Sequence, residues 1–149
     1  MTLKELKNTE GRLLGVDFGD SRTGLAVSDP MRKLASGRET VKAVGLENTA
    51  RLVADYARAE GVSGIIVGLP KNMDGSCGHR AERAVRFAGL LGELTGLPVV
   101  TLDERLSTVQ ASRYLNATDT RGAKRKGVID TLSAQIILQD ALDRMKETK

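Results

Sequence analysis

Acidic residues stand at three places in the chain where solubility does not require them. Asp17 lies inside an apolar run, Asp103 and Glu104 close a second apolar run, and Asp130 opens a segment of helical periodicity. Converging carboxylates repel one another unless a cation lies between them, and hard oxygen ligands select Mg²⁺ or Mn²⁺. Two such ions about 4 Å apart activate water and stabilise the leaving oxygen in phosphodiester cleavage. The acids therefore suggest metal-dependent phosphodiester chemistry.

Each acid also has a purely structural interpretation. Asp17 could cap a turn by accepting hydrogen bonds from the next few backbone amides, as Asp often does. Asp103 could pair with Arg105 or cap the following helix, and Asp130 could simply favour a helix N-terminus. Metal binding is favoured over these structural roles only if the acids lie close together in the folded protein.

Basic and polar residues accompany the acids along the chain. Arg22 follows Asp17, and Arg105 follows Glu104, so either guanidinium could grip a phosphate by forked hydrogen bonds or pair with the neighbouring acid. The full set of nucleic-acid-binding candidates is Arg22, Lys71, Asn72, Arg105, Arg121, Lys124, Arg125 and Lys126. The alternative for the cluster before Asp130 is an ordinary solvated loop.

The hydrophobic pattern predicts one α/β domain over residues 1–149. An apolar hairpin and a third strand come first, followed by alternating helices and short buried strands. Such an order predicts a mixed five-stranded sheet, an antiparallel meander extended by parallel strands and flanked by helices. The expected strands are 13–18, 23–28, 37–41, 62–69 and 99–102, and the expected helices are 47–59, 81–95, 108–115 and 128–145.

Composition narrows the class of protein. The net charge of +4 permits a polyanionic partner, whereas 3% aromatic residues and no Trp argue against a base-stacking platform. A single cysteine and no long apolar run predict a cytoplasmic protein without a membrane partner, and residues 1–12 are expected to be a flexible extension. Cys77 and His79 lack the further soft ligands that a zinc site needs.

Four ordered motifs resemble those of the bacterial YqgF/RuvX family. The first is GVDFG with RTGLAVSD, over 15–19 and 22–29, and the second is VGLPKNMDG at 67–75. The third is DERLST at 103–108, and the fourth is the Ile-Asp pair at 129–130 that opens a helix of small residues. Asp20 and the 132–134 triplet depart from the usual pattern, but neither departure removes an acid.

The resemblance implies a ribonuclease H-like fold and a metal-dependent nuclease. By this resemblance Asp17, Glu104 and Asp130 are the catalytic, metal-binding carboxylates, with Asp103 as a fourth candidate. It also implies one of two substrates: the 5′ end of pre-16S ribosomal RNA in ribosome biogenesis, or the Holliday junction of DNA recombination.

Several functions stay open at this stage. Maturation of pre-16S rRNA, on its own or within a ribosomal particle, fits a monomer or a homodimer, whereas junction resolution requires two active sites and hence a dimer. A non-catalytic RNA-binding assembly factor would use the same basic residues, with the acids serving structure alone. A phosphate loop of the actin and sugar-kinase type is less favoured, because those proteins duplicate the domain.

Overall fold

The computed structural model describes residues 2–19, 21–70, 79–104 and 122–147. Within these ranges, the side chains of Pro70, His79, Arg80, Asp103, Glu104, 122–130 and Glu147 are outside the description. The elements are α1 (Leu3–Lys7), β1 (Leu13–Asp17), β2 (Arg22–Ser28), β3 (Ala35–Lys42), α2 (Leu46–Glu60), β4 (Gly64–Pro70), α3 (His79–Thr95), β5 (Val99–Glu104) and α5 (Gly122–Glu147).

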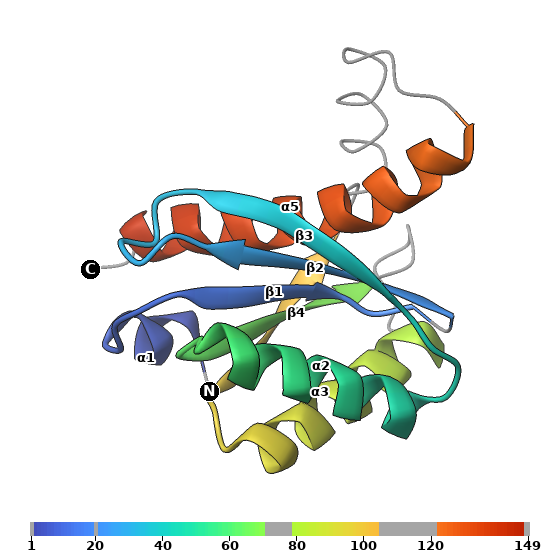
Figure 1. Ribbon diagram of the computed structural model, residues 1–149. Coiled ribbons are helices and arrows are strands. Elements are labelled where there is room, and N and C mark those ends of the chain that lie inside the picture. Colours follow the sequence, from blue (N-terminus) through green and yellow to red (C-terminus); the bar gives the residue numbers. More distant parts are fainter. Residues whose placement is uncertain (1, 20, 71–78, 105–121, 148–149) are drawn as a thin grey trace.

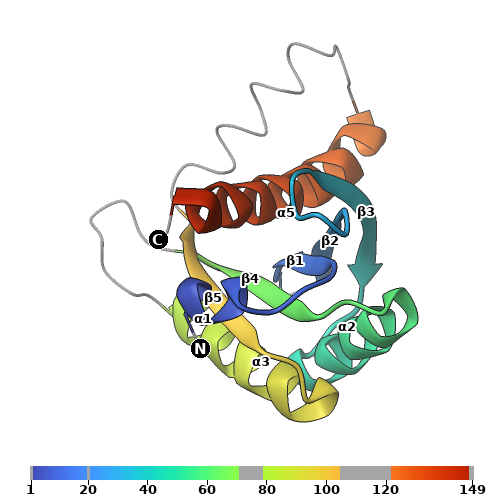
Figure 2. The ribbon, with the colours of Figure 1, turned by 90° about the vertical axis from the view of Figure 1, so that its left-hand side faces the viewer.

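The five strands form one mixed sheet in the order β3-β2-β1-β4-β5. β1, β2 and β3 pair antiparallel, while β4 and β5 run parallel to β1. Helices α2 and α3 cover one face and α5 lies along the other (Figures 1 and 2). The predicted antiparallel meander with parallel additions is therefore confirmed.

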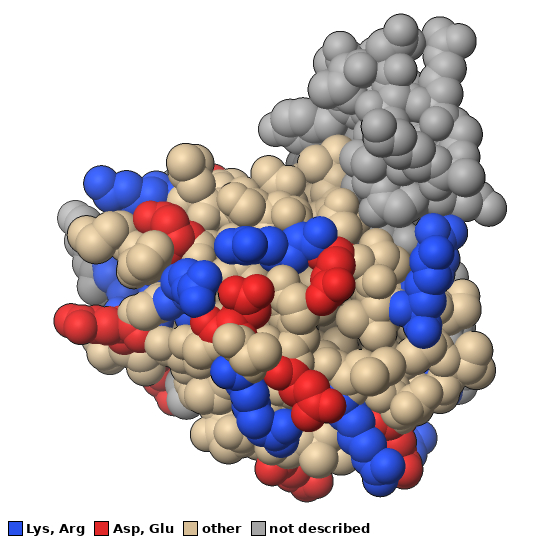
Figure 3. Space-filling model, in the orientation of Figure 1, with Lys and Arg blue, Asp and Glu red and all other residues tan. Residues whose placement is uncertain are grey.

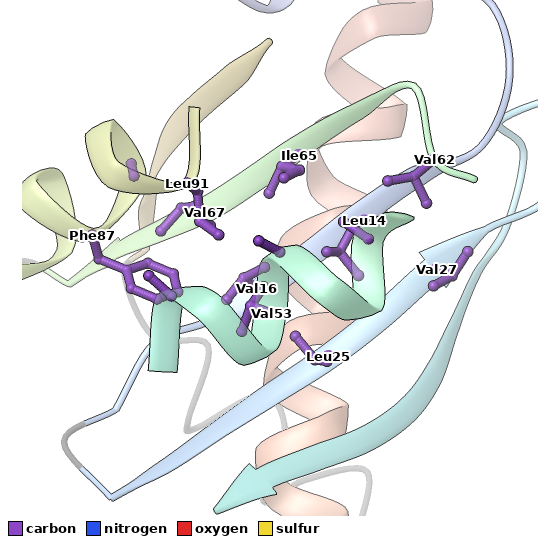
Figure 4. Close-up of a cluster of buried hydrophobic side chains, with 14 residues drawn as sticks. Leu14, Val16, Leu25, Val27, Val53, Val62, Ile65, Val67, Phe87 and Leu91 are labelled. Carbon is purple, nitrogen blue, oxygen red and sulfur yellow. The ribbon is translucent and has the colours of Figure 1, made fainter. Parts of the chain in front are cut away.

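The face covered by α2 and α3 carries a large apolar core. Alternate residues of each strand enter it, because successive side chains of a strand point to opposite faces of the sheet. Figure 4 shows them packed against Val53 of α2 and against Phe87 and Leu91 of α3. The strand contributors are Leu14, Val16, Leu25, Val27, Ile65 and Val67.

The face covered by α5 is formed by the other half of the alternation. Leu13, Ala26, Ile66, Val100 and Leu102 meet a run of buried α5 side chains. The run comprises Ala134, Ile137, Leu138, Ala141, Leu142 and Met145. Ala134, Ile137 and Ala141 stand four, seven and eleven residues after Asp130, so the helical periodicity predicted after this acid is confirmed.

The N-terminal segment differs from the expected flexible extension. Leu3–Lys7 forms α1, and Leu6 is fully buried among the α5-face residues. Arg32 fixes this segment by donating hydrogen bonds to the carbonyl oxygens of Gly11 and Leu6, at 2.7 and 3.0 Å, and to Thr9 Oγ1 at 2.7 Å. A single buried leucine in a charged stretch gave too little periodicity for the sequence to reveal this packing.

Two other boundaries change where candidate residues lie. β5 continues through Asp103 and Glu104, which the sequence placed just beyond the strand. α5 begins at Gly122, six residues before the predicted start, so 124–126 belongs to a helix and not to the solvated loop that was the alternative for this cluster. The predicted helix 108–115 lies outside the described residues. None of the described helices is long and apolar enough to span a membrane.

Candidate active site

Asp17 is the last residue of β1 and lies on the face of the sheet that α5 covers. It pairs with Gly24 of β2, which in turn pairs with Thr40 of β3. The neighbouring pair, Thr23 and Val41, belongs to the opposite face, because Val41 packs into the cluster beneath α2 and α3. Asp17 and Thr40 therefore flank a glycine on the α5 face, and Asp17 is partly buried there.

Gly15 determines how closely α5 approaches β1. A Cβ atom at this position would stand 2.7 Å from Leu138 Cβ and 3.0 Å from the carbonyl oxygen of Ala134. Both obstacles belong to the helix backbone or sit directly on it, so no side-chain rotation relieves them. Only glycine lets the helix rest on the strand at this depth.

The contact between α5 and Gly15 of β1 brings the position of Asp130 to the same end of the sheet as Asp17. α5 runs antiparallel to β1, because Gln139, further along the helix, bonds the Ala35 amide at the opposite end of the sheet. Asp130 precedes Ala134 by one helical turn, about 6 Å, and Asp17 follows Gly15 by two strand residues, about 7 Å. The two steps run in the same direction from one contact, so the backbone brings both acidic positions to one end of the α5 face.

The register of β4 and β5 assigns Asp103 and Glu104 to opposite faces of the sheet. Val100 and Leu102 belong to the α5-face cluster. Glu104 continues that alternation and is paired with Pro70, while Asp103 falls at the intervening position, paired with Leu69. By backbone register, Glu104 shares the face of Asp17 and Asp103 does not.

The chain that follows Asp17 is anchored on both sides. Phe18 stacks on Phe87 of α3, with ring centroids 4.4 Å apart and planes inclined by 22°. The Gly19 amide donates to Thr23 Oγ1 at 3.3 Å, and the Thr23 hydroxyl donates to the Gly19 carbonyl at 3.4 Å. Neither aromatic residue nor Thr23 was singled out from the sequence, and the adjacency of Phe18 to Asp17 was the available signal.

The basic candidates fall into three groups. Arg22 opens β2 and lies on the α5 face, two residues beyond the partner of Asp17. Lys124, Arg125 and Lys126 lie in the first turns of α5, which project beyond the sheet in Figure 1. Lys71, Asn72, Arg105 and Arg121 lie outside the described residues, as does Cys77.

A preformed cluster of three His, Cys, Asp or Glu side chains is not found among the described side chains, a set that omits Glu104 and Asp130. The donor set is nonetheless uniform in chemistry. The three candidate positions, Asp17, Glu104 and Asp130, all carry carboxylates, and an all-oxygen set of ligands suits Mg²⁺ or Mn²⁺ better than zinc, which favours Cys and His.

Relatives of known name match nearly the whole chain. A protein from Pelotomaculum thermopropionicum is 44% identical over 89% of this chain and 86% of its own length. One from Bradyrhizobium sp. strain ORS 278 is 48% identical over 91% of this chain and 84% of its own length. Both are named for a pre-16S rRNA nuclease.

Solved structures share the fold at low sequence identity. RuvC of Thermus thermophilus, in complex with a Holliday junction substrate, has a TM-score of 0.59 at 15% identity, covering 93% of this chain and 98% of its own. The nuclease domain of the human cytomegalovirus terminase has a TM-score of 0.56 at 11% identity, covering 97% and 93%. These likenesses establish a ribonuclease H-like, RuvC-type fold.

The family model of RuvX, described as a Holliday junction resolvase, matches residues 11–144 and spans every motif discussed above. Since that range is most of the chain, and the named relatives agree over the same length, the chain belongs to the RuvX family.

Proposed function

We propose that this protein is a divalent-metal-dependent nuclease that matures the 5′ end of pre-16S rRNA. The single observation that carries the proposal is the placement of three acidic positions at one end of the α5 face. Asp17 ends β1, Glu104 ends β5, and Asp130 lies one turn before the seat of α5 on Gly15. The names of the relatives supply the substrate.

Asp17, Glu104 and Asp130 are the residues that would hold Mg²⁺ or Mn²⁺. We assign Asp103 a supporting role, because backbone register places it on the opposite face. When bound, such ions would supply Lewis-acid stabilisation of the charge that develops on the phosphate oxygens, and they would lower the pKa of the attacking water.

The rest of the site is assigned to positioning. Gly15 sets the separation of α5 from β1 and hence of Asp130 from Asp17. The stacked pair Phe18 and Phe87 holds the chain at the end of β1. Arg22, Arg105 and the 124–126 cluster would orient the nucleic-acid backbone, since phosphate contacts fix register without reading sequence.

Two substrates assayed side by side test the proposal. A precursor 16S RNA fragment and a synthetic four-way DNA junction are incubated with wild type in Mn²⁺ and in EDTA. We expect metal-dependent cutting of the RNA near the mature 5′ end. Asp130→Asn should reduce that rate by at least about 100-fold while circular dichroism shows an unchanged fold.

Other outcomes decide between the remaining functions. Symmetric cutting of the junction alone, by a dimer, would replace RNA maturation with junction resolution. RNA binding without cutting of either substrate would make the protein an assembly factor and the acids structural.

A further inference from the structure

The edge strand β3 combines exposed charged residues with a contact to α5. Its exposed residues include Arg38, Glu39 and Lys42, and Figure 3 shows Lys and Arg interspersed with Asp and Glu over the face of the molecule that it displays. Mixed charge of this kind discourages an edge strand from pairing with other chains. β3 also packs against α5 (Figures 1 and 2), the helix that carries Asp130.

Gly37 is the residue that brings β3 close to α5. It pairs with Ala26 of β2, which belongs to the α5-face cluster and pairs in turn with Gly15 of β1. These three small residues form one row across the sheet, and α5 crosses that row. A Cβ atom at Gly37 would stand 3.3 Å from Thr131 Cβ and 3.4 Å from Gln135 Oε1. The helix therefore approaches the strand backbone at both ends of the row.

One row of α5 side chains follows β3. Thr131, Gln135 and Gln139 are spaced four residues apart, which puts them on one side of the helix. The first two lie over the β3 glycine, and the third bonds the chain further on. Gln139 Oε1 accepts from the Ala35 amide at 2.9 Å, and Gln139 Nε2 donates to the Lys33 carbonyl at 3.0 Å. This row holds α5 to β3 over two helical turns.

A second row of α5 side chains rests on β1. Ala134 and Leu138, also one turn apart, lie over Gly15. The two rows stand on strands that are separated by β2, so α5 is supported on both sides of its axis. Rolling the helix about that axis would press one row into a strand backbone and lift the other. Gly15 and Gly37 therefore fix the rotation of α5 as well as its depth.

The rotation of α5 bears on the acidic positions, because Thr131 directly follows Asp130. A Cβ atom at position 37 would lift the row on β3, since its 3.3 Å from Thr131 Cβ is closer than the best separation of two carbon atoms, about 3.5–4.0 Å. Thr131 Cβ is bonded to the helix backbone, so no side-chain rotation relieves the contact. With the row on Gly15 still in place, α5 would roll and carry the Asp130 backbone with it.

We propose that Gly37 is a positioning residue for the metal site. Together with Gly15, it fixes the rotation of α5 and hence the place of Asp130 relative to Asp17 and Glu104. The inference rests on the proposed nuclease function, and it concerns the binding of the metal rather than contact with the nucleic acid. Gly37 acts through α5, so it is not a catalytic residue.

Binding of Mn²⁺ in the absence of RNA tests the inference. Electron paramagnetic resonance measures the free ion during titration of wild type, Gly37→Ala, Gly37→Val and Ser36→Val. Ser36→Val is the matched control, because Ser36 is exposed on the same strand and pairs with Val27, which belongs to the core on the opposite face. We expect Gly37→Val to weaken Mn²⁺ binding by about 10-fold or more, as for other residues that orient metal ligands, and Gly37→Ala to weaken it less. Ser36→Val should bind Mn²⁺ as wild type does.

The melting temperature in EDTA separates positioning from stability, because all titrations are made below the transition of each variant. If Gly37→Val melts below the assay temperature, Gly37→Ala is compared with Ser36→Ala instead. Equal Mn²⁺ affinities for the Gly37 variants and their Ser36 controls, in a wild type that binds Mn²⁺ and cuts RNA, would overturn the role of Gly37 and leave the nuclease intact. A wild type that neither binds Mn²⁺ nor cuts RNA would overturn both.

Discussion

The two ends of the sheet use polar residues in opposite ways. At the end near α1, Asp29 accepts hydrogen bonds from the amides of Met31, Lys33 and Leu34, and Gln139 bonds the backbone of Lys33 and Ala35. At the other end, Asp17 and Arg22 stand on the α5 face beside a glycine, with Lys42 exposed opposite Arg22. At the first end, polar side chains form hydrogen bonds with the protein's own backbone. At the second end, charged side chains gather on one face of the sheet.

This difference indicates which end of the sheet carries the functional residues. Polar groups that accept or donate hydrogen bonds to the backbone of a loop contribute to stability, and their removal should leave the chemistry intact. Charged groups at the ends of neighbouring strands are the ones that a ligand would contact, so their removal should impair activity more than stability. Substitutions at the two ends should therefore separate stability from activity.

The largest combined effect is expected at Gly15. Gly15→Ala pushes α5 away from β1, because the new Cβ meets the carbonyl oxygen of Ala134 at 3.0 Å. We expect a loss of about 1–3 kcal/mol in the free energy of unfolding, together with a fall in the cleavage rate that exceeds the fraction unfolded. Denaturant titration and single-turnover cleavage measure the two.

Gly64→Ala is the matched control for Gly15→Ala. Its Cβ would stand 2.6 Å from Leu6 Cδ1, at the opposite end of the sheet. It should lower stability while the folded protein keeps the wild-type rate. Equal losses of rate in the two variants would show that the seat at Gly15 has no special relation to the acids.

The next effect concerns the guanidinium that ties down the N-terminal segment. Arg32 has a φ of 58°, so Arg32→Gly removes three hydrogen bonds without adding backbone strain. We expect a loss of about 1–3 kcal/mol with an unchanged cleavage rate below the transition. Reduced cleavage by fully folded Arg32→Gly would contradict the claim that one end of the sheet serves stability and the other serves activity.

A smaller coupling is expected between Phe18 and Phe87. The stacked rings should contribute about 0.5–1.5 kcal/mol beyond their burial, measured as the interaction energy of a double-mutant cycle with Leu at each position. The Phe18→Leu variant should also require more Mn²⁺ for half-maximal cleavage, because the end of β1 is held less firmly. Purely additive stabilities and an unchanged metal requirement would contradict this role.

The smallest effect is a pH dependence at Asp29. Its backbone hydrogen bonds, that from the Leu34 amide first, lower the pKa of this carboxyl below its ordinary value of 3.8. A depressed pKa stabilises the fold above the ordinary value, and that stability is lost as the pH falls through the folded pKa. Asp29→Asn should therefore flatten the acid limb of the melting temperature against pH. An acid limb as steep as that of wild type would contradict the assignment.

The sequence predicted the sheet because alternation and periodicity are local signals. The hairpin, the parallel strands and the helix ends at Gly61 and Gly96 follow from apolar runs and from glycines that adopt positive φ, here 65° and 71°. The prediction of a flexible N-terminal extension was wrong at α1, because the burial of Leu6 depends on residues far along the chain.

The sequence proposes which residue types form the candidate site, but it does not show how their positions are arranged. That Asp17 and Glu104 share a face while Asp103 does not depends on strand register, which no single segment encodes. The role assigned to Gly15 was missed for the same reason, since the close approach of a helix to a strand appears only in three dimensions.

The most direct test of the central claim compares the same substitution at the two ends. Mn²⁺-dependent cleavage of the precursor 16S RNA fragment is measured for wild type, Asp17→Asn and Asp29→Asn, each shown to be folded at the assay temperature. We predict that Asp17→Asn loses at least about 100-fold in rate and that Asp29→Asn cuts as wild type does. A folded Asp17→Asn that cuts at the wild-type rate would contradict the account.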